Sequence, residues 1–447
     1  MPPLNHETVR EMIRTGTPDR VLRLIGKSHP ADVAPLFKDL EPHETRLLFD
    51  VVFSTRKAAK TLKELPPELL PDILALIDDE KIGRMIARAD PDDAVTFIGS
   101  LPEERRERVL SHVDPERRAG FDKMISYPEG TVGRIMTTDL LALSPDITAQ
   151  GAIDKIRERG ELETFFYLYV VDEAGKLIGV VPIRNLVVAP PGRPLRDMMI
   201  ADPIRAEVSM DQEEAARLVS KYDLLALPIV DHDGRLAGLI TVDDVIDVIA
   251  DETTEDMYKM AGVGIKERAF SPLMESVVRR VPWLGFNMVW AFAAASVISA
   301  FEKTIGQVPS LAIFMPIIAG QAGNAGIQTA TVVVRSMALG EIESGNLSQL
   351  LRKEWSLGLI KGTIFGTVLG TVAWLWKGNA VLGLVAGLAM FLNMLVAATG
   401  GVLVPTALRR LGFDPATVAG VFDTMLTDFM GFLIFLGLAT LLIHFLT

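Results

Sequence analysis

The chain has 447 residues, of which 49% are hydrophobic, and a formal net charge of −12. This length predicts two to four domains, and the negative charge argues against nucleic acid as a partner, because phosphate binding requires clustered lysine and arginine. The absence of cysteine excludes disulfides, thiolate zinc sites and cysteine nucleophiles. Residues 1–16 have no apolar core, so we expect no cleavable signal peptide.

The charge is distributed unevenly. Residues 281–447 hold seven of the 57 acidic and eight of the 45 basic residues, and residues 1–280 hold the other 50 and 37. An acidic, soluble N-terminal portion therefore precedes a nearly neutral, apolar C-terminal portion.

Residues 1–130 are predicted to form an all-α bundle or superhelix. Apolar residues recur at helical spacing with frequent proline stops, and His29–Ala34 is loosely repeated by Asp90–Val95. Short helices that recur in this way stack into solenoid-like modules. Nothing in this region has the arrangement of a catalytic site, so we interpret it as an interaction module.

Residues 131–192 and 193–250 are predicted to be two copies of one α/β unit. The run Val170–Val181 reads as strand, Asp…Gly turn and strand, and it recurs 59 positions later as Ile229–Ile240. An amphipathic helix precedes each copy. This duplication resembles a tandem pair of CBS domains, which implies a regulatory module that binds adenine nucleotides, such as ATP, or metal ions.

The resemblance also implies candidate nucleotide contacts. The second copy has Thr241-x-x-Asp244, where the CBS family often grips ribose and phosphate, whereas the first has Pro182-x-x-Asn185 and lacks both groups. Tyr167 and Arg184 are candidates by family position.

An acidic connecting segment, residues 251–280, is predicted to follow the second repeat. Its acidic helix face already starts within the end of that repeat. Asp244, Asp247, Asp251 and Glu255 share one helix face. One interpretation is a solvated acidic face; the other is divalent-cation binding, since oxygen ligands without cysteine or clustered histidine suit Mg²⁺ or Ca²⁺. The further carboxylates of this hypothetical cation sensor are Glu252, Asp256, Asp90, Asp92, Asp93 and Asp223.

Residues 281–447 are predicted to form a five-helix membrane domain, because a span needs about 20 predominantly apolar residues. The expected spans are Pro282–Phe301, Ser310–Val334, Ser356–Trp376, Gly378–Val404 and Ala416–Phe445. Basic residues concentrate before the first span and in alternate loops. We expect a multi-pass protein of the cytoplasmic (inner) membrane. By the positive-inside rule its N-terminus is cytoplasmic and its C-terminus lies outside.

Glycines repeat every four residues in the third span, at Gly358, Gly362, Gly366 and Gly370. Small residues at this spacing let two helix backbones approach closely in lipid. We interpret the stripe as a helix-packing surface in preference to a direct part of an ion pathway.

Polar side chains mark the second and fifth spans. Gln321, Asn324 and Gln328 form one stripe, which predicts either hydrogen bonds between helices or the lining of an ion pathway. A charged group at the centre of a span costs on the order of 3 kcal/mol and usually marks an ion path. Asp428 fits that role, the alternative being a buried partner for Lys361 or an amide. Asp423 is a second candidate pore acid, the alternative again being a buried structural partner. It lies about 140° round the helix from Asp428, so both acids cannot face one lumen equally.

The complete order of elements resembles the MgtE family of magnesium transporters. Ala322–Gln328 is similar to the family's Gly-Asn-x-x-x-Gln signature, Asp414-Pro415-Ala416 to its loop motif, and Asp428 falls at its pore aspartate. Val421 stands where the family commonly has proline, and Asp423 where it has threonine.

This resemblance implies a homodimeric, magnesium-sensing Mg²⁺ transporter or channel with its pore between the two copies. The alternatives are a CBS-gated transporter of another divalent cation (Mn²⁺, Co²⁺) or of a different solute. An enzyme is not expected, because the chain has no His-Glu-x-x-His, Gly-x-Ser-x-Gly or Walker-type motif.

Overall fold

The computed structural model describes residues 6–14, 18–38, 40–67, 69–159, 166–264, 267, 271–338, 340–342, 346–417 and 419–446. The chain divides into two compact units, Met1–Ile249 and Ala250–Thr447.

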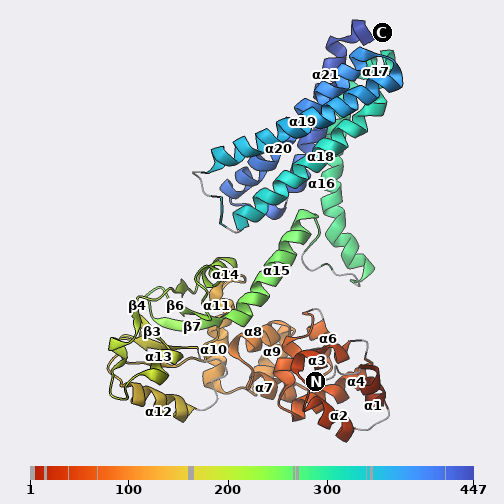
Figure 1. The fold of residues 1–447 in the computed structure, drawn as a ribbon. Helices are drawn as coiled ribbons and strands as arrows, with labels where there is room; N and C mark the ends of the chain where they lie inside the picture. Colours follow the sequence, from red (N-terminus) through yellow and green to blue (C-terminus); the bar gives the residue numbers. More distant parts are fainter. Residues whose placement is uncertain are drawn as a thin grey trace. The chain divides into compact units, whose positions relative to one another are not determined.

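The first unit begins with a succession of short helices (Figure 1). Proline at the first helical position starts α3, α4, α8 and α10, where its missing N–H is not needed. The elements are α1 (His6–Arg14), α2 (Pro18–Ile25), α3 (Pro30–Val33), η1 (Ala34–Phe37), α4 (Pro42–Ser54), α5 (Ala58–Lys63), α6 (Leu69–Ala75), α7 (Asp79–Ile86), α8 (Pro91–Gly99), α9 (Glu103–Leu110) and α10 (Pro115–Ile125).

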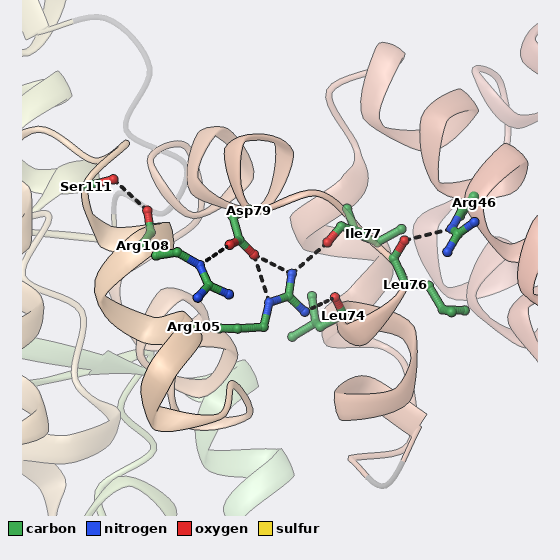
Figure 2. A network of polar contacts seen from close by, with 8 residues as sticks. All are labelled: Arg46, Leu74, Leu76, Ile77, Asp79, Arg105, Arg108 and Ser111. Carbon is green, nitrogen blue, oxygen red and sulfur yellow. Dashed lines mark hydrogen bonds and ion pairs between the residues drawn. The ribbon is translucent and has the colours of Figure 1, made fainter.

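A hydrogen-bond network centred on a partly buried arginine connects three of these helices (Figure 2). Arg105 of α9 donates to the carbonyl oxygens of Leu74 and Ile77, at the end of α6, and to Asp79 at the start of α7. Arg108 donates to the other oxygen of Asp79 at 2.8 Å. The hydrogen bond from Arg108, together with that from Arg105, lowers the pKa of Asp79. The helix-terminal carbonyls thereby receive the donors that their own helix lacks.

Two small sheets follow, as the sequence duplication predicts. The first has the order β1-β2-β3-β4 and the second β5-β6-β7. Their strands are β1 (Ala142–Leu143), β2 (Tyr167–Val171), β3 (Leu177–Pro182), β4 (Ile200–Ala201), β5 (Ala206–Glu207), β6 (Ala226–Val230) and β7 (Leu236–Thr241). The accompanying helices are α11 (Val132–Ile135), α12 (Ala149–Arg159), α13 (Ile183–Val188), η2 (Leu195–Asp197) and α14 (Gln212–Lys221).

The two hairpins are equivalent in detail, so the predicted duplication is confirmed. In each, an aspartate side chain accepts hydrogen bonds from two backbone N–H groups across the turn. Asp172 accepts from Ala174 and Lys176 in the first hairpin, and Asp231 accepts from the two equivalent groups in the second. The turn closes with glycine in the left-handed region, Gly175 or Gly234, each at φ +79. Both hairpins carry a register shift at the same place, between Val170 and Val171 and one repeat later.

A continuous core joins the helical region to the second repeat. It includes Phe97 of α8, Ile229 of β6 and Val245 of α15 (Val242–Met260), all buried. The first turns of α15 are therefore packed within the first unit.

The second unit contains long apolar helices that lie side by side (Figure 1). They are α16 (Leu273–Ala300), α17 (Glu302–Gln307), α18 (Leu311–Ala338), α19 (Leu347–Lys377), α20 (Ala380–Arg410), η3 (Pro415–Thr417), α21 (Ala419–Leu441) and α22 (Ile443–Leu446). Among the described residues, four segments have the length and mean hydropathy of a membrane span: Leu273–Ala300, Leu347–Lys377, Ala380–Arg410 and Gly420–Leu441.

The expected second span, α18, is not among those four. It has 28 residues, but Gln321, Asn324 and Gln328 reduce its hydropathy. It packs on both α20 and α21. The third span begins earlier than expected, at Leu347, and so includes Glu354.

The glycine stripe is a packing surface, as predicted. A Cβ built on Gly366 would lie 2.7 Å from the carbonyl oxygen of Gly387, and one on Gly370 would lie 2.8 Å from that of Gly383. Both acceptors belong to α20, so the two backbones meet without side chains between them.

Gly366→Ala is therefore expected to destabilise the membrane unit by about 1–3 kcal/mol, because the new methyl group must push a backbone away. Gly437→Ala on α21 is the matched control, since its Cβ would have no heavy atom within 4 Å. Thermal unfolding of both variants in detergent measures the difference. Equal melting temperatures would show that the stripe does not fix the helix contact.

Candidate cation sites

The polar stripe of α18 is exposed in the single chain. Gln321, Asn324 and Gln328 face outward, whereas Ala322 and Gly326 on the other side of the helix are buried. Lys361 of α19 donates to the side-chain oxygen of Gln328 at 3.3 Å. Lys361 is thus joined to the stripe by a hydrogen bond.

The two acids of α21 lie in different surroundings. Asp428 is half-buried. Asp423 is completely buried, and neither of its carboxylate oxygens has a hydrogen-bond partner among the residues that the structure describes. Its carboxylate fills the space that a Cβ on Gly326 of α18 or Gly400 of α20 would occupy. Asp423 therefore points into the interior of its own helix bundle.

The contact between α18 and α21 brings Asn324 and Asp428 to one region. A Cβ on Gly323 would lie 3.4 Å from the Thr424 methyl group and 3.6 Å from the Thr427 hydroxyl oxygen. Asn324 follows Gly323, and Asp428 follows Thr427, so both polar residues border this contact. An amide and a carboxylate together supply the oxygen ligands that a divalent cation prefers.

The last turns of α15 contact the membrane helices within the second unit. Lys259 forms ion pairs with Glu255, one turn earlier, and with Asp414 before α21. Met260 packs against Val334 of α18 and against Ala416. This end of α15 is thus attached to α18, which carries Asn324, and to the segment that leads into α21, which carries Asp428.

Several charged side chains lie around the contact between Lys259 and Asp414. Burial lowers the pKa of Lys259, but its bonds to Asp414 and Glu255 outweigh this and raise it. Burial, and then Asp414, raise the pKa of Asp256, and Glu252 adds to the effect. The predicted sensor residues Glu252, Glu255 and Asp256 therefore lie together in one electrostatic cluster.

A second cluster lies in the first unit, around Lys63 at the end of α5. Its ammonium group lies 3.1 Å from an oxygen of Asp244, 3.5 Å from Asp93 and 4.0 Å from Asp92. Burial and the neighbouring carboxylates raise the pKa of Asp92. Burial also raises the pKa of Asp93, although Lys63 opposes the shift.

The remaining predicted sensor residues are placed as follows. Asp90 precedes α8 as its N-cap residue, Asp223 is exposed with a left-handed backbone (φ 52), and Asp247 is exposed on α15. Among the residues that the structure describes, no three or more acidic or histidine side chains form a group arranged to hold a metal ion. The cluster that contains Asp92, Asp93 and Asp244 is centred on a lysine.

The candidate nucleotide residues lie at the first repeat. Tyr167 is half-buried at the start of β2, paired with Pro182, and Arg184 is exposed on α13. The Thr241 hydroxyl donates to Asp244 at 2.8 Å, so this motif forms a bond within the chain.

Family models match most of the chain. The model of the MgtE divalent cation transporter matches residues 315–438, that of the MgtE intracellular N domain residues 28–130, and that of the CBS domain residues 132–192 and 195–251. The "Magnesium transporter MgtE" of Bacillus subtilis is 31% identical over 435 residues, 97% of this chain and 96% of the relative. The chain belongs to the MgtE family. The MgtE protein of Thermus thermophilus is also 31% identical, over 98% of both chains.

Two solved structures resemble about half of the chain. The crystal structure of the soluble part of a magnesium transporter is 27% identical, with a TM-score of 0.51, covering 55% of this chain and 97% of its own. That of the cytosolic domain of the Mg²⁺ channel MgtE in complex with ATP is 30% identical, with a TM-score of 0.52, covering 54% and 99%.

Two buried polar side chains of this MgtE chain were missed by the sequence analysis. Asn393 of α20 is fully buried and donates to the carbonyl oxygens of Thr427 and Ile318, which joins α20 to α21 and α18. Glu354 of α19 is buried and accepts from the Thr329 hydroxyl at 3.1 Å. A single amide within the apolar stretch 380–404 was the available signal for Asn393.

Proposed function

We propose that this chain is a Mg²⁺-selective transporter or channel that closes when intracellular Mg²⁺ is high. The observation that carries the proposal is that α18 bears an exposed amide stripe and that α21, which packs on α18, bears the half-buried Asp428. Exposed amides and a carboxylate are unfavourable against lipid, so they belong at a partner subunit or a water-filled path. The magnesium transporters to which the chain is similar support the choice of ion.

The proposed assembly is a homodimer with the pore between two copies of the second unit. The support is that Gln321, Asn324 and Gln328 are exposed in the single chain. When α18 is counted with the other four apolar helices, the chain has five spans. Its ends then lie on opposite sides of the membrane, the N-terminus in the cytoplasm. Arg409 and Arg410, at the end of α20, then lie on the cytoplasmic side, in agreement with the positive-inside rule.

The proposed chemistry follows from the hydration of Mg²⁺. This ion requires octahedral geometry and loses water reluctantly, so it is best held largely hydrated. Two Asp428 carboxylates, one from each copy, with Asn324 amides and backbone carbonyls, accept hydrogen bonds from that water shell. Such outer-sphere contacts also leave binding weak enough for release.

Ion flux in proteoliposomes, with a panel of divalent cations and varied internal Mg²⁺, tests this function. We expect Mg²⁺ flux that internal Mg²⁺ suppresses. Preferential transport of Mn²⁺ or Co²⁺, or of another solute, would favour the alternatives.

The proposed sensor consists of the acidic residues of the first unit and of α15. When Mg²⁺ is scarce, carboxylates such as Asp90, Asp223 and Asp247 repel their neighbours, and bound Mg²⁺ offsets that repulsion. The contacts of Lys259 and Met260 with Asp414, Ala416 and Val334 support a role for α15 as the plug that transmits the change to α18 and α21.

The energy of such a gate sets the number of ions. Moving a two-state equilibrium from 1:99 to 99:1 takes about 5.5 kcal/mol of differential binding. One site at ten times its dissociation constant supplies about 1.4 kcal/mol. Roughly four ions per dimer are therefore required, or about two per copy.

Asp244→Asn/Asp247→Asn is accordingly expected to shift closure to higher Mg²⁺ and to make it less steep, with unchanged open-state flux. Protease protection of α15 across a Mg²⁺ titration measures the midpoint and the steepness of closure. The same midpoint and slope in wild type and variant would mean that these carboxylates are only a solvated face.

We also propose that the CBS pair binds an adenine nucleotide near Tyr167 and Arg184. The ATP complex of a similar cytosolic domain supports this assignment. A calorimetric titration with ATP tests it, and Arg184→Ala should weaken the binding.

A further inference from the structure

The ammonium group of Lys63 connects two parts of the first unit that are far apart in sequence. Lys63 is the last residue of α5, in the helical region. It donates to Asp244, which lies 181 positions later in the first turn of α15, directly after β7 of the second repeat. Its other two carboxylates, Asp92 and Asp93, are in the first turn of α8. One cation thus lies between carboxylates of the helical region and one of the repeat.

The charge of Lys63 and those of its three carboxylate neighbours are partly buried. The side chain of Asp93 is 8% exposed, those of Asp92 and Asp244 are 15% and 16% exposed, and that of Lys63 is 33% exposed. Partly buried charges are screened less than surface charges. Three carboxylates held this close repel one another, and removal of the compensating charge from a buried group is strongly destabilising.

The Asp244 carboxylate is fixed from both sides. One oxygen accepts from Lys63 at 3.1 Å, and the other accepts from the Thr241 hydroxyl at 2.8 Å. Its position, and therefore the start of α15, is set by a bond from each of the two parts. A divalent cation that approaches this carboxylate meets an oxygen pair that is already hydrogen-bonded.

We propose that Lys63 is a tethered cation that holds the helical region on the second repeat in the absence of a divalent ion. With all three carboxylates ionised, one positive charge leaves two negative charges, which a single Mg²⁺ neutralises. Mg²⁺ then strengthens a contact that Lys63 has already formed. This inference rests on the proposed sensor function for its Mg²⁺ response but not for docking without Mg²⁺.

The distance between spin labels in the full-length protein measures the docking. The chain has no cysteine, so Glu103→Cys on α9 and Ser220→Cys on α14, both exposed positions, are labelled specifically. Co-expression with an excess of unlabelled chain restricts the signal to pairs within one chain. In EDTA, the parent protein should give one narrow distance population, and Lys63→Met should raise the undocked fraction roughly tenfold. Saturating Mg²⁺ should restore docking.

Two controls separate this role from a general loss of stability. Lys63→Arg keeps the charge and should remain docked in EDTA. Lys60→Met removes an exposed lysine one turn earlier on the same helix and should behave as the parent protein.

Docking of Lys63→Met in EDTA at the level of the parent protein would overturn the inference, as would an undocked parent protein. If Lys63→Met opens in EDTA and Mg²⁺ does not close it, the tether is supported and the Mg²⁺ sensor function fails.

Discussion

Asp428→Ala is expected to abolish Mg²⁺ flux, by at least on the order of a hundredfold, without loss of folding. Asp428 is the half-buried acid of α21 and follows Thr427, whose hydroxyl oxygen lies at the contact with Gly323 of α18. Its carboxylate lowers the energy of a divalent cation in a medium where water cannot fully do so. In the proposed dimer, one substitution removes both pore carboxylates at once.

Asp423→Ala is the matched control for this prediction. The sequence analysis proposed Asp423 as a second pore acid, and its complete burial against Gly326 and Gly400 leads us to expect a milder change in rate or selectivity. Flux in proteoliposomes, with size-exclusion profiles to verify assembly, measures both variants. Full transport by a correctly assembled Asp428→Ala protein would refute the pore assignment.

The features that sequence predicted well were those with local signals. The paired hairpins followed from a 59-residue repeat with an Asp…Gly turn, and each turn indeed uses the aspartate oxygen and a left-handed glycine. The glycine stripe followed from a spacing that can only place those residues on one face of a helix. In both cases neighbouring residues contain the whole physical cause.

The features that sequence could not predict depend on distant contacts. Acidic residues were grouped by helical spacing, but nothing near Asp244 in sequence indicates that Lys63 lies 3.1 Å away. Asp414 was noted only as part of a motif, and its pairing with Lys259 spans 155 positions. Helical spacing put Asp423 and Asp428 on different faces of one span but did not show which acid is buried, because that depends on the packed neighbours Gly326 and Gly400.

Deletion of residues 1–250 is expected to leave a protein that conducts Mg²⁺ but is no longer closed by internal Mg²⁺. The second unit is compact from Ala250 onward and retains the Lys259–Asp414 contact. The deletion removes the cluster of Asp92, Asp93, Asp244 and Lys63. Closure requires roughly 5.5 kcal/mol of differential binding, and the share that these carboxylates contribute is then lost.

The decisive measurement compares flux from full-length and truncated protein in proteoliposomes across a series of internal Mg²⁺ concentrations. Full-length flux should fall at least on the order of tenfold at high internal Mg²⁺, whereas truncated flux should remain constant. The truncated protein carrying Asp428→Ala must be silent, since any flux through it would bypass the proposed pore. Inhibition of the truncated protein at the same internal Mg²⁺ concentration as the full-length protein would place the sensor in α15 beyond residue 250 or in the membrane helices, because those are the acidic elements that the deletion leaves in place.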